Sequence, residues 1–118
     1  MTITLTLPYP PPLDMLYATV RTKRGTLIRV LSKRGKQFKA DTETICLAQR
    51  VKPITGDVKV VFRAYRPKRI GDLDGLFKIV FDALKGYAYI DDKQIVKIEA
   101  DRYDDKLAPR VELEITEV

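Results

Sequence analysis

The segment from Asp72 to Lys85 constrains the fold most, because its apolar residues recur at helical intervals. This single apolar stripe consists of Leu73, Leu76, Phe77, Val80 and Leu84. Gly86 follows at the position where glycine commonly ends a helix. A helix with one apolar stripe must bury it against another layer of structure. The rest of the chain therefore has to supply that layer.

The other periodic segments alternate apolar and polar residues, as half-buried strands do. The expected strands are Thr2–Leu7, Tyr17–Thr22, Thr26–Leu31, Asp57–Tyr65, Gln94–Tyr103 and Arg110–Val118. The second and third flank a basic turn and form a hairpin. A further helix runs from Ser32, a good N-cap residue, to about Val51. This order predicts an α+β fold, with one domain over residues 1–118 and a mixed sheet packed by two helices.

The residue types present exclude several kinds of active site. The chain of 118 residues has no histidine and a single cysteine, Cys46. Internal disulfides, His/Cys zinc sites, Ser-His-Asp triads and histidine general bases are therefore excluded. The sequence has no apolar run long enough to cross a membrane and no signal-peptide pattern, so we expect a cytoplasmic protein without a membrane partner.

Basic residues gather in two acid-free regions of a chain whose net charge is +6. Residues 15–40 hold eight lysines and arginines, and residues 58–71 hold five more. Such regions favour a polyanionic partner, most simply nucleic acid, although a solvated basic face is the alternative. The candidate DNA-binding residues are Arg21, Lys23, Arg24, Lys33, Arg34, Lys36, Arg66, Lys68 and Arg69.

Carboxylates surround the predicted helix. Asp72 and Asp74 lie at its start, Lys78 lies one turn after Asp74, and a short loop leads to Asp91 and Asp92. If that loop returns to the start of the helix, the carboxylates converge and need a cation to neutralise them. Oxygen ligands alone select Mg²⁺ or Mn²⁺, which beside a basic surface suits phosphodiester hydrolysis. The alternative is structural: helix caps, an ordinary surface ion pair and an acidic turn.

The combined motifs resemble those of the RusA family of Holliday junction resolvases. The resemblance rests on Asp-Leu-Asp at residues 72–74, the following Lys78, Asp-Ala-Leu at residues 82–84 and Asp-Asp-Lys-Gln at residues 91–94. The segments Leu-Pro-Tyr-Pro-Pro at residues 7–11 and 32–39 match in the same order. The resemblance thus covers nearly the whole chain.

The resemblance implies a Mg²⁺-dependent homodimer that binds branched DNA, specifically four-way junctions, and cuts two opposing strands. Asp72, Asp74 and Asp92 match the acidic catalytic positions, with Asp91 as an adjacent metal ligand, and Lys78 matches the catalytic lysine. No small-molecule cofactor is expected. Members are often encoded by phages or prophages, which implies roles in DNA recombination, repair or packaging.

Three positions depart from the family pattern. Gly75 stands where asparagine is usual, Gly71 where a basic residue is frequent, and Asp14 where asparagine follows the prolines. Glycine cannot orient a ligand, and Asp14 adds negative charge. A catalytically weak or inactive module that binds branched DNA is therefore the alternative, and a related nuclease acting on flaps or RNA is a third.

Overall fold

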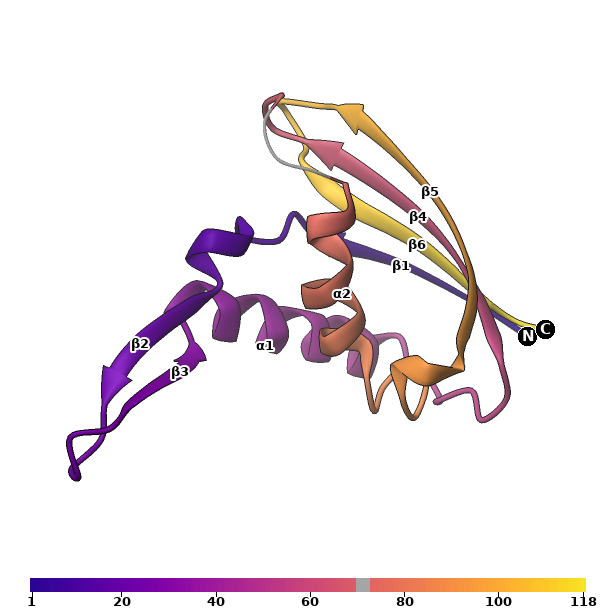
Figure 1. Ribbon diagram of the computed structural model, residues 1–118. Helices are drawn as coiled ribbons and strands as arrows, with labels where there is room; N and C mark the ends of the chain where they lie inside the picture. The colour runs from indigo at the N-terminus through magenta and orange to yellow at the C-terminus, as the bar shows by residue number, and fades with distance from the viewer. Residues whose placement is uncertain (70–72) are drawn as a thin grey trace.

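A mixed four-stranded sheet forms the centre of the molecule, in the order β1-β6-β4-β5. A computed structural model describes residues 1–69 and 73–118 (Figure 1). The sheet strands are β1 (Thr2–Pro8), β4 (Val58–Arg66), β5 (Ile95–Asp104) and β6 (Arg110–Glu117). β6 runs antiparallel to both of its neighbours, whereas β4 and β5 are parallel. The predicted α+β class with a mixed sheet is confirmed.

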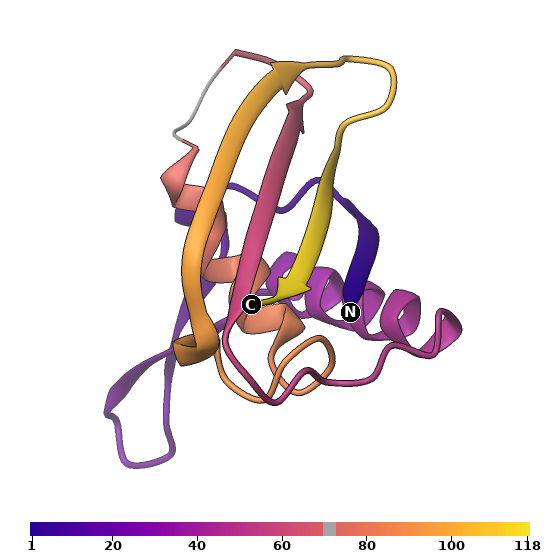
Figure 2. The same cartoon turned by 90° about the vertical axis from the view of Figure 1, so that its right-hand side faces the viewer.

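Two helices, α1 (Lys33–Ala48) and α2 (Phe77–Leu84), lie on the same side of this sheet, and its other face is left open (Figures 1 and 2). The inward face of β4 is apolar and buried. Phe62 of β4 makes edge-to-face ring contacts with Phe77 and Phe81 of α2, at centroid distances of 5.0 and 5.9 Å. This packing fixes α2, and hence the acidic residues at its two ends, against the sheet.

The local sequence signals for the helices are confirmed. Ser32 caps α1, since its hydroxyl accepts a hydrogen bond of 3.1 Å from the Gly35 N–H. Gly86, just after α2, has a φ of 86°, a left-handed conformation that favours glycine. Cys46 is buried as a small apolar residue, and burial raises the pKa of its thiol to about 11.

The second helix begins later than the sequence predicts. A turn of 3₁₀ helix, η2 (Asp74–Leu76), precedes α2, and Asp72 lies outside the described residues. Two more single turns of this kind, η1 (Leu13–Met15) and η3 (Asp92–Gln94), were not predicted. No described helix is long and apolar enough to cross a membrane.

The predicted hairpin stands apart from the main sheet. Its strands β2 (Tyr17–Arg21) and β3 (Leu27–Leu31) pair only with each other and extend away from the body (Figures 1 and 2). The hairpin is attached at its base, where the backbone N–H of Ser32 donates to the carbonyl of Leu16. A basic turn, Lys23-Arg24, therefore reaches beyond the core.

Candidate functional site

The N-terminal end of α2 carries two charged side chains that the fold does not use. Asp74 begins η2, but neither its carboxylate nor any other side chain caps that turn. Lys78 lies one turn later and forms no ion pair with Asp74. Within residues 1–69 and 73–118, neither side chain has a hydrogen-bond or ion-pair partner. The alternative of an ordinary Asp74–Lys78 surface pair therefore finds no support among these residues, whereas a cap formed by Asp72 stays untested.

The catalytic and metal-binding role predicted for Asp72 is not tested. Ile70, Gly71 and Asp72 all lie outside the described residues. The departure at Gly71 lies there too.

The C-terminal end of α2 holds a second acidic group. Asp91 caps η3 by accepting a hydrogen bond of 3.0 Å from the Lys93 N–H, and its carboxylate lies 3.5 Å from the Lys85 ammonium. The Lys93 N–H, a hydrogen bond from Asp92 and the charge of Lys85 lower the pKa of Asp91. The hydrogen bond to Asp91, burial and the charges of Asp91 and Asp82 raise the pKa of Asp92. The two neighbouring carboxyl groups therefore shift each other's pKa in opposite directions.

Gln94 fixes the position of this acidic turn with four hydrogen bonds. Its side-chain oxygen accepts from the N–H groups of Ile90 and Asp91, at 2.8 and 2.9 Å. Its amide nitrogen donates to the carbonyls of Ile54 and Gly56, both at 2.7 Å. The glutamine of the Asp-Asp-Lys-Gln motif is therefore a positioning residue. Its place three residues after Asp91, which is the spacing of a capping box, is the sequence signal that could have revealed this role.

Tyr89 forms a buried support behind the same group. Its hydroxyl donates a hydrogen bond of 2.7 Å to the carbonyl of Phe81 in α2. Burial raises the pKa of Tyr89 strongly, and the charges of Asp92, Asp82 and Asp91 raise it further. Asp82 therefore belongs to the acidic group at the C-terminal end of α2. No local sequence pattern distinguishes Tyr89 from an ordinary half-buried aromatic residue, so the sequence analysis missed this support.

The expectation that the loop returns Asp91 and Asp92 to the start of the helix is wrong. η3 lies beside the C-terminal end of α2, whereas η2 with Asp74 precedes its N-terminal end (Figures 1 and 2). The N–H of Gly86 donates to the Tyr89 carbonyl, so the chain turns back immediately after α2. The eight residues of α2 span about 12 Å. In the part of the chain that is described, no three carboxylates or thiolates lie close enough to hold one metal ion.

Most of the candidate DNA-binding residues lie on the surface without a competing acid. Arg21, Lys23 and Arg24 lie at the far end of the hairpin, Lys33, Arg34 and Lys36 in the first turns of α1, and Lys68 and Arg69 after β4. None of these eight forms an ion pair with a described residue. Their charge therefore remains available to an anionic partner.

Arg66 differs from the other candidates. Only 7% of its surface is exposed, and its Nε donates a hydrogen bond of 2.9 Å to Asp104. Its carbonyl accepts from the N–H of Asp105 at 2.7 Å. These contacts make Arg66 an anchor for the end of β4, from which the chain leads to Lys68 and Arg69.

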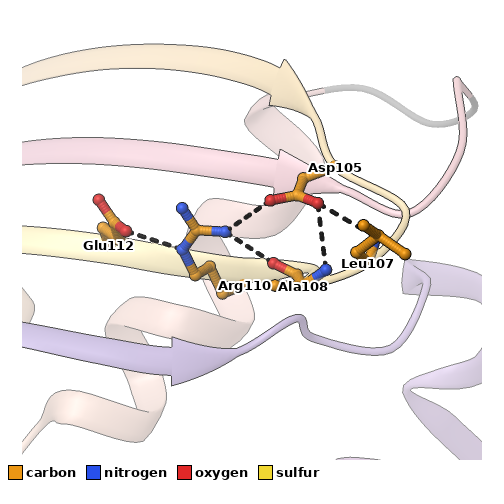
Figure 3. Close-up of polar contacts among 5 residues, drawn as sticks. All are labelled: Asp105, Leu107, Ala108, Arg110 and Glu112. Carbon is orange, nitrogen blue, oxygen red and sulfur yellow. Dashed lines mark hydrogen bonds and ion pairs between the residues drawn. The ribbon is translucent and has the colours of Figure 1, made fainter.

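The Arg66 anchor adjoins a rigid turn between β5 and β6. Arg110 donates to Asp105 at 2.9 Å and to Glu112 at 2.7 Å, while Asp105 accepts from the N–H groups of Leu107 and Ala108 at 3.1 Å (Figure 3). The N–H of Asp105 also donates to the carbonyl of Arg66. The network around Arg110 therefore supports the C-terminal end of β4, which precedes α2 in the chain.

The comparison with protein families decides the relationship. The family described as Endodeoxyribonuclease RusA matches residues 10–116. The chain belongs to the RusA family. A search of curated proteins found no match. The match spans both ends of α2 and the basic segments, and it associates them with a family of DNA nucleases.

Packing in this RusA family member does not require glycine at position 75. A Cβ atom placed on Gly75 meets no atom of the described residues within 4 Å. The position is therefore open to the asparagine that the family pattern contains. The remaining departure, Asp14, lies in η1 at the base of the hairpin and is exposed.

Proposed function

We propose that this chain is a Mg²⁺-dependent endonuclease that resolves four-way DNA junctions by paired cuts, acting as a homodimer in the cytoplasm. Family membership supports the nuclease chemistry. Its acidic residues, its uncompensated basic surface and the separation of its carboxylates support the finer assignment. Such an activity serves DNA recombination, repair or the processing of phage genomes.

The observation that carries the proposal is the pair of opposite charges left unused at the N-terminal end of α2. Asp74 and Lys78 are one helical turn apart, yet neither has a partner among the described residues. A free carboxylate invites a cation, and a free ammonium invites a phosphate. A phosphodiester with a bound divalent ion offers a cation to the carboxylate and a negatively charged oxygen to the ammonium.

The donor set fits a hard divalent cation. Asp72, Asp74, Asp91 and Asp92 offer only carboxylate oxygens, which suit Mg²⁺ and Mn²⁺ better than softer metals. When bound, the ion supplies Lewis-acid stabilisation of the charge that develops on the phosphate. These carboxylates would hold that ion.

The remaining steps belong to side chains of the protein. Lys78 is placed to bind a phosphate oxygen and to stabilise negative charge in the transition state. Lys68 and Arg69 bind neighbouring phosphates and set the position of the strand. The basic residues of the hairpin and α1 supply affinity that falls steeply as salt rises.

The separation of the carboxylates supports a homodimer. Asp74 and Asp92 lie at opposite ends of α2 in one chain, so a second copy is needed to bring carboxylates from both ends to one phosphate. Two such sites related by a twofold axis also match two opposing strands of a four-way junction.

Cleavage of a synthetic four-way junction tests the proposal. We expect two symmetric nicks with Mg²⁺, no cleavage with EDTA, and recovery of cleavage when Mn²⁺ is added. Retardation of the junction without cleavage in any metal would contradict the nuclease proposal and favour the binding module that Gly75 and Asp14 suggested. Linear, flap and RNA substrates run in parallel separate junction resolution from broader nuclease activity.

A further inference from the structure

The β2–β3 hairpin has two chemically different faces. Residues that pair across an antiparallel ribbon share a face, and the pairs Ala18–Val30 and Val20–Ile28 place four apolar side chains on one of them. The pairs Thr19–Arg29 and Arg21–Leu27 place two arginines and the 60% exposed Leu27 on the other, which continues into the Tyr17–Leu31 pair at the base. The hairpin is therefore an amphipathic ribbon rather than a uniformly basic arm.

The apolar face is uncovered except at Val30, which is half-buried. Val20 is 41% exposed and Ile28 is 43% exposed, and Ala18 is exposed as well. The core of the molecule lies elsewhere, between the main sheet and the two helices (Figure 1). An isolated two-stranded hairpin is only marginally stable in water. A partner that covers this face would therefore stabilise both the ribbon and the basic turn that it carries.

We propose that this face, formed by Ala18, Val20, Ile28 and Val30, packs against the same face of a second copy of the chain. This inference rests on the homodimer of the proposed function and names its contact surface. The face contains no charged side chain, so two copies can meet across a twofold axis without like-charge repulsion. A phosphate backbone would gain nothing from these four residues, whereas the opposite face and the basic turn suit DNA.

The charges of the hairpin favour an antiparallel arrangement of the two ribbons. A parallel arrangement would bring together two copies of the basic turn, with Arg21, Lys23 and Arg24 in each. The antiparallel arrangement instead places each basic turn beside the base of the partner ribbon, where Asp14 is exposed and forms no ion pair with a described residue. In this arrangement Asp14 would pair with the basic turn of the partner ribbon.

The size of the face sets the expected affinity. Four small or medium side chains per chain bury much less than the roughly 800 Å² per partner of a standard interface. We therefore expect a reversible dimer with a dissociation constant in the micromolar range, strengthened when a junction binds both chains.

Sedimentation over about 1–100 µM protein tests the inference. Val20→Lys and Ile28→Lys each place a charge in the apolar face, and we expect the dissociation constant to rise about 100-fold or more. Thr19→Lys adds the same charge to the opposite face and is expected to leave the dimer intact. Equal melting temperatures for the three variants would show that the body remains folded.

A second measurement does not depend on destabilising the contact. In a Cys46→Ala background, we expect a short thiol cross-linker to join Val20→Cys chains but not Thr19→Cys chains. A monomeric wild-type protein, or dimers that survive Val20→Lys and Ile28→Lys, would overturn the inference. Loss of junction binding by variants that remain dimeric would also overturn it, since the face would then contact DNA. Junction cleavage by the wild type is scored separately, so a different dimer surface would not remove the nuclease function.

Discussion

Both ends of α2 carry aspartate side chains, but among the described residues only those at the C-terminal end are held by hydrogen bonds and an ion pair. At the C-terminal end, Asp91 accepts a backbone hydrogen bond, pairs with Lys85 and lies in a turn that Gln94 fixes. At the N-terminal end, Asp74 has no partner among the described residues. One end of the helix is thus organised by the protein before any ligand binds, and the other end keeps its charge uncompensated.

This difference indicates that the two ends of α2 contribute to ligand binding in different ways. A carboxylate held by hydrogen bonds is positioned in advance, which reduces the entropy lost when a ligand binds. A carboxylate without partners has no competing contact to break. We therefore expect substitution of Asp74 to lower the cleavage rate and substitution of Gln94 to lower the free energy of unfolding.

The largest expected effect is that of Asp74→Asn on cleavage. We expect junction cleavage to fall by about 100-fold or more, because a cation and the developing charge lose their carboxylate. The melting temperature should stay close to that of the wild type, since Asp74 has no hydrogen-bond or ion-pair partner among residues 1–69 and 73–118. Gel-based cleavage assays and thermal melting check both parts. Asp101→Asn, on the open face of the sheet, is the matched control that should change neither.

Mixing two inactive variants sharpens this prediction. If a site takes carboxylates from two copies, a mixed dimer of Asp74→Asn and Asp92→Asn chains holds one intact site and one doubly altered site. Such a dimer should nick one strand of the junction. Complete inactivity of the mixture would show instead that each site lies within one chain.

Gln94→Leu is expected to give the next largest effect, and on stability first. It leaves two carbonyls and two N–H groups without their partner, which costs about 2–3 kcal/mol of unfolding free energy after water satisfies the more exposed groups. Chemical denaturation measures this loss. Gln94→Glu keeps the acceptor for the N–H groups of Ile90 and Asp91 but loses the donor to the carbonyls of Ile54 and Gly56. Its unfolding free energy should therefore lie between those of the wild type and Gln94→Leu. Unchanged stability in Gln94→Leu would contradict its role as a positioning residue.

The same two ends show what the sequence could predict. Short-range signals identified the elements correctly: the alternation of Ile3, Leu5 and Leu7 gave a strand with its inward face buried, and Ser32 and Gly86 marked helix ends. Each of these signals acts within a few residues, where backbone geometry determines the result.

The arrangement of the site could not be predicted in this way. A loop of seven residues after α2 is long enough to turn in either direction, and the hydrogen bonds of Gln94 to Ile54 and Gly56 decide which direction it takes. Those contacts join positions about 40 residues apart in the sequence, which no local pattern encodes. The separate placement of the hairpin likewise depends on tertiary packing.

Gly75 offers a smaller change at the N-terminal end of α2. Its Cβ position is open, so Gly75→Ala should raise the unfolding free energy by about 0.5 kcal/mol through a less flexible unfolded chain. Gly75→Asn should do less for stability but raise the cleavage rate, because an amide beside Asp74 can orient a ligand. Denaturation and cleavage under one set of conditions separate the two effects. A lower cleavage rate in Gly75→Asn would mean that glycine is required there.

The smallest expected effect concerns the turn that supports the approach to this end of α2. Hydrogen bonds from Arg110 and from the N–H groups of Ala108 and Leu107 lower the pKa of Asp105 below its ordinary value of 3.8 (Figure 3). A lowered pKa in the folded state stabilises the protein above the unfolded pKa, and this stabilisation disappears as the pH falls through the folded pKa. Asp105→Asn should therefore lower the melting temperature slightly at pH 7, and its difference from the wild type should shrink below about pH 4. Asp101→Asn on β5 supplies the control without such partners, and an equal pH dependence in both variants would contradict the contribution of the Asp105–Arg110 pair.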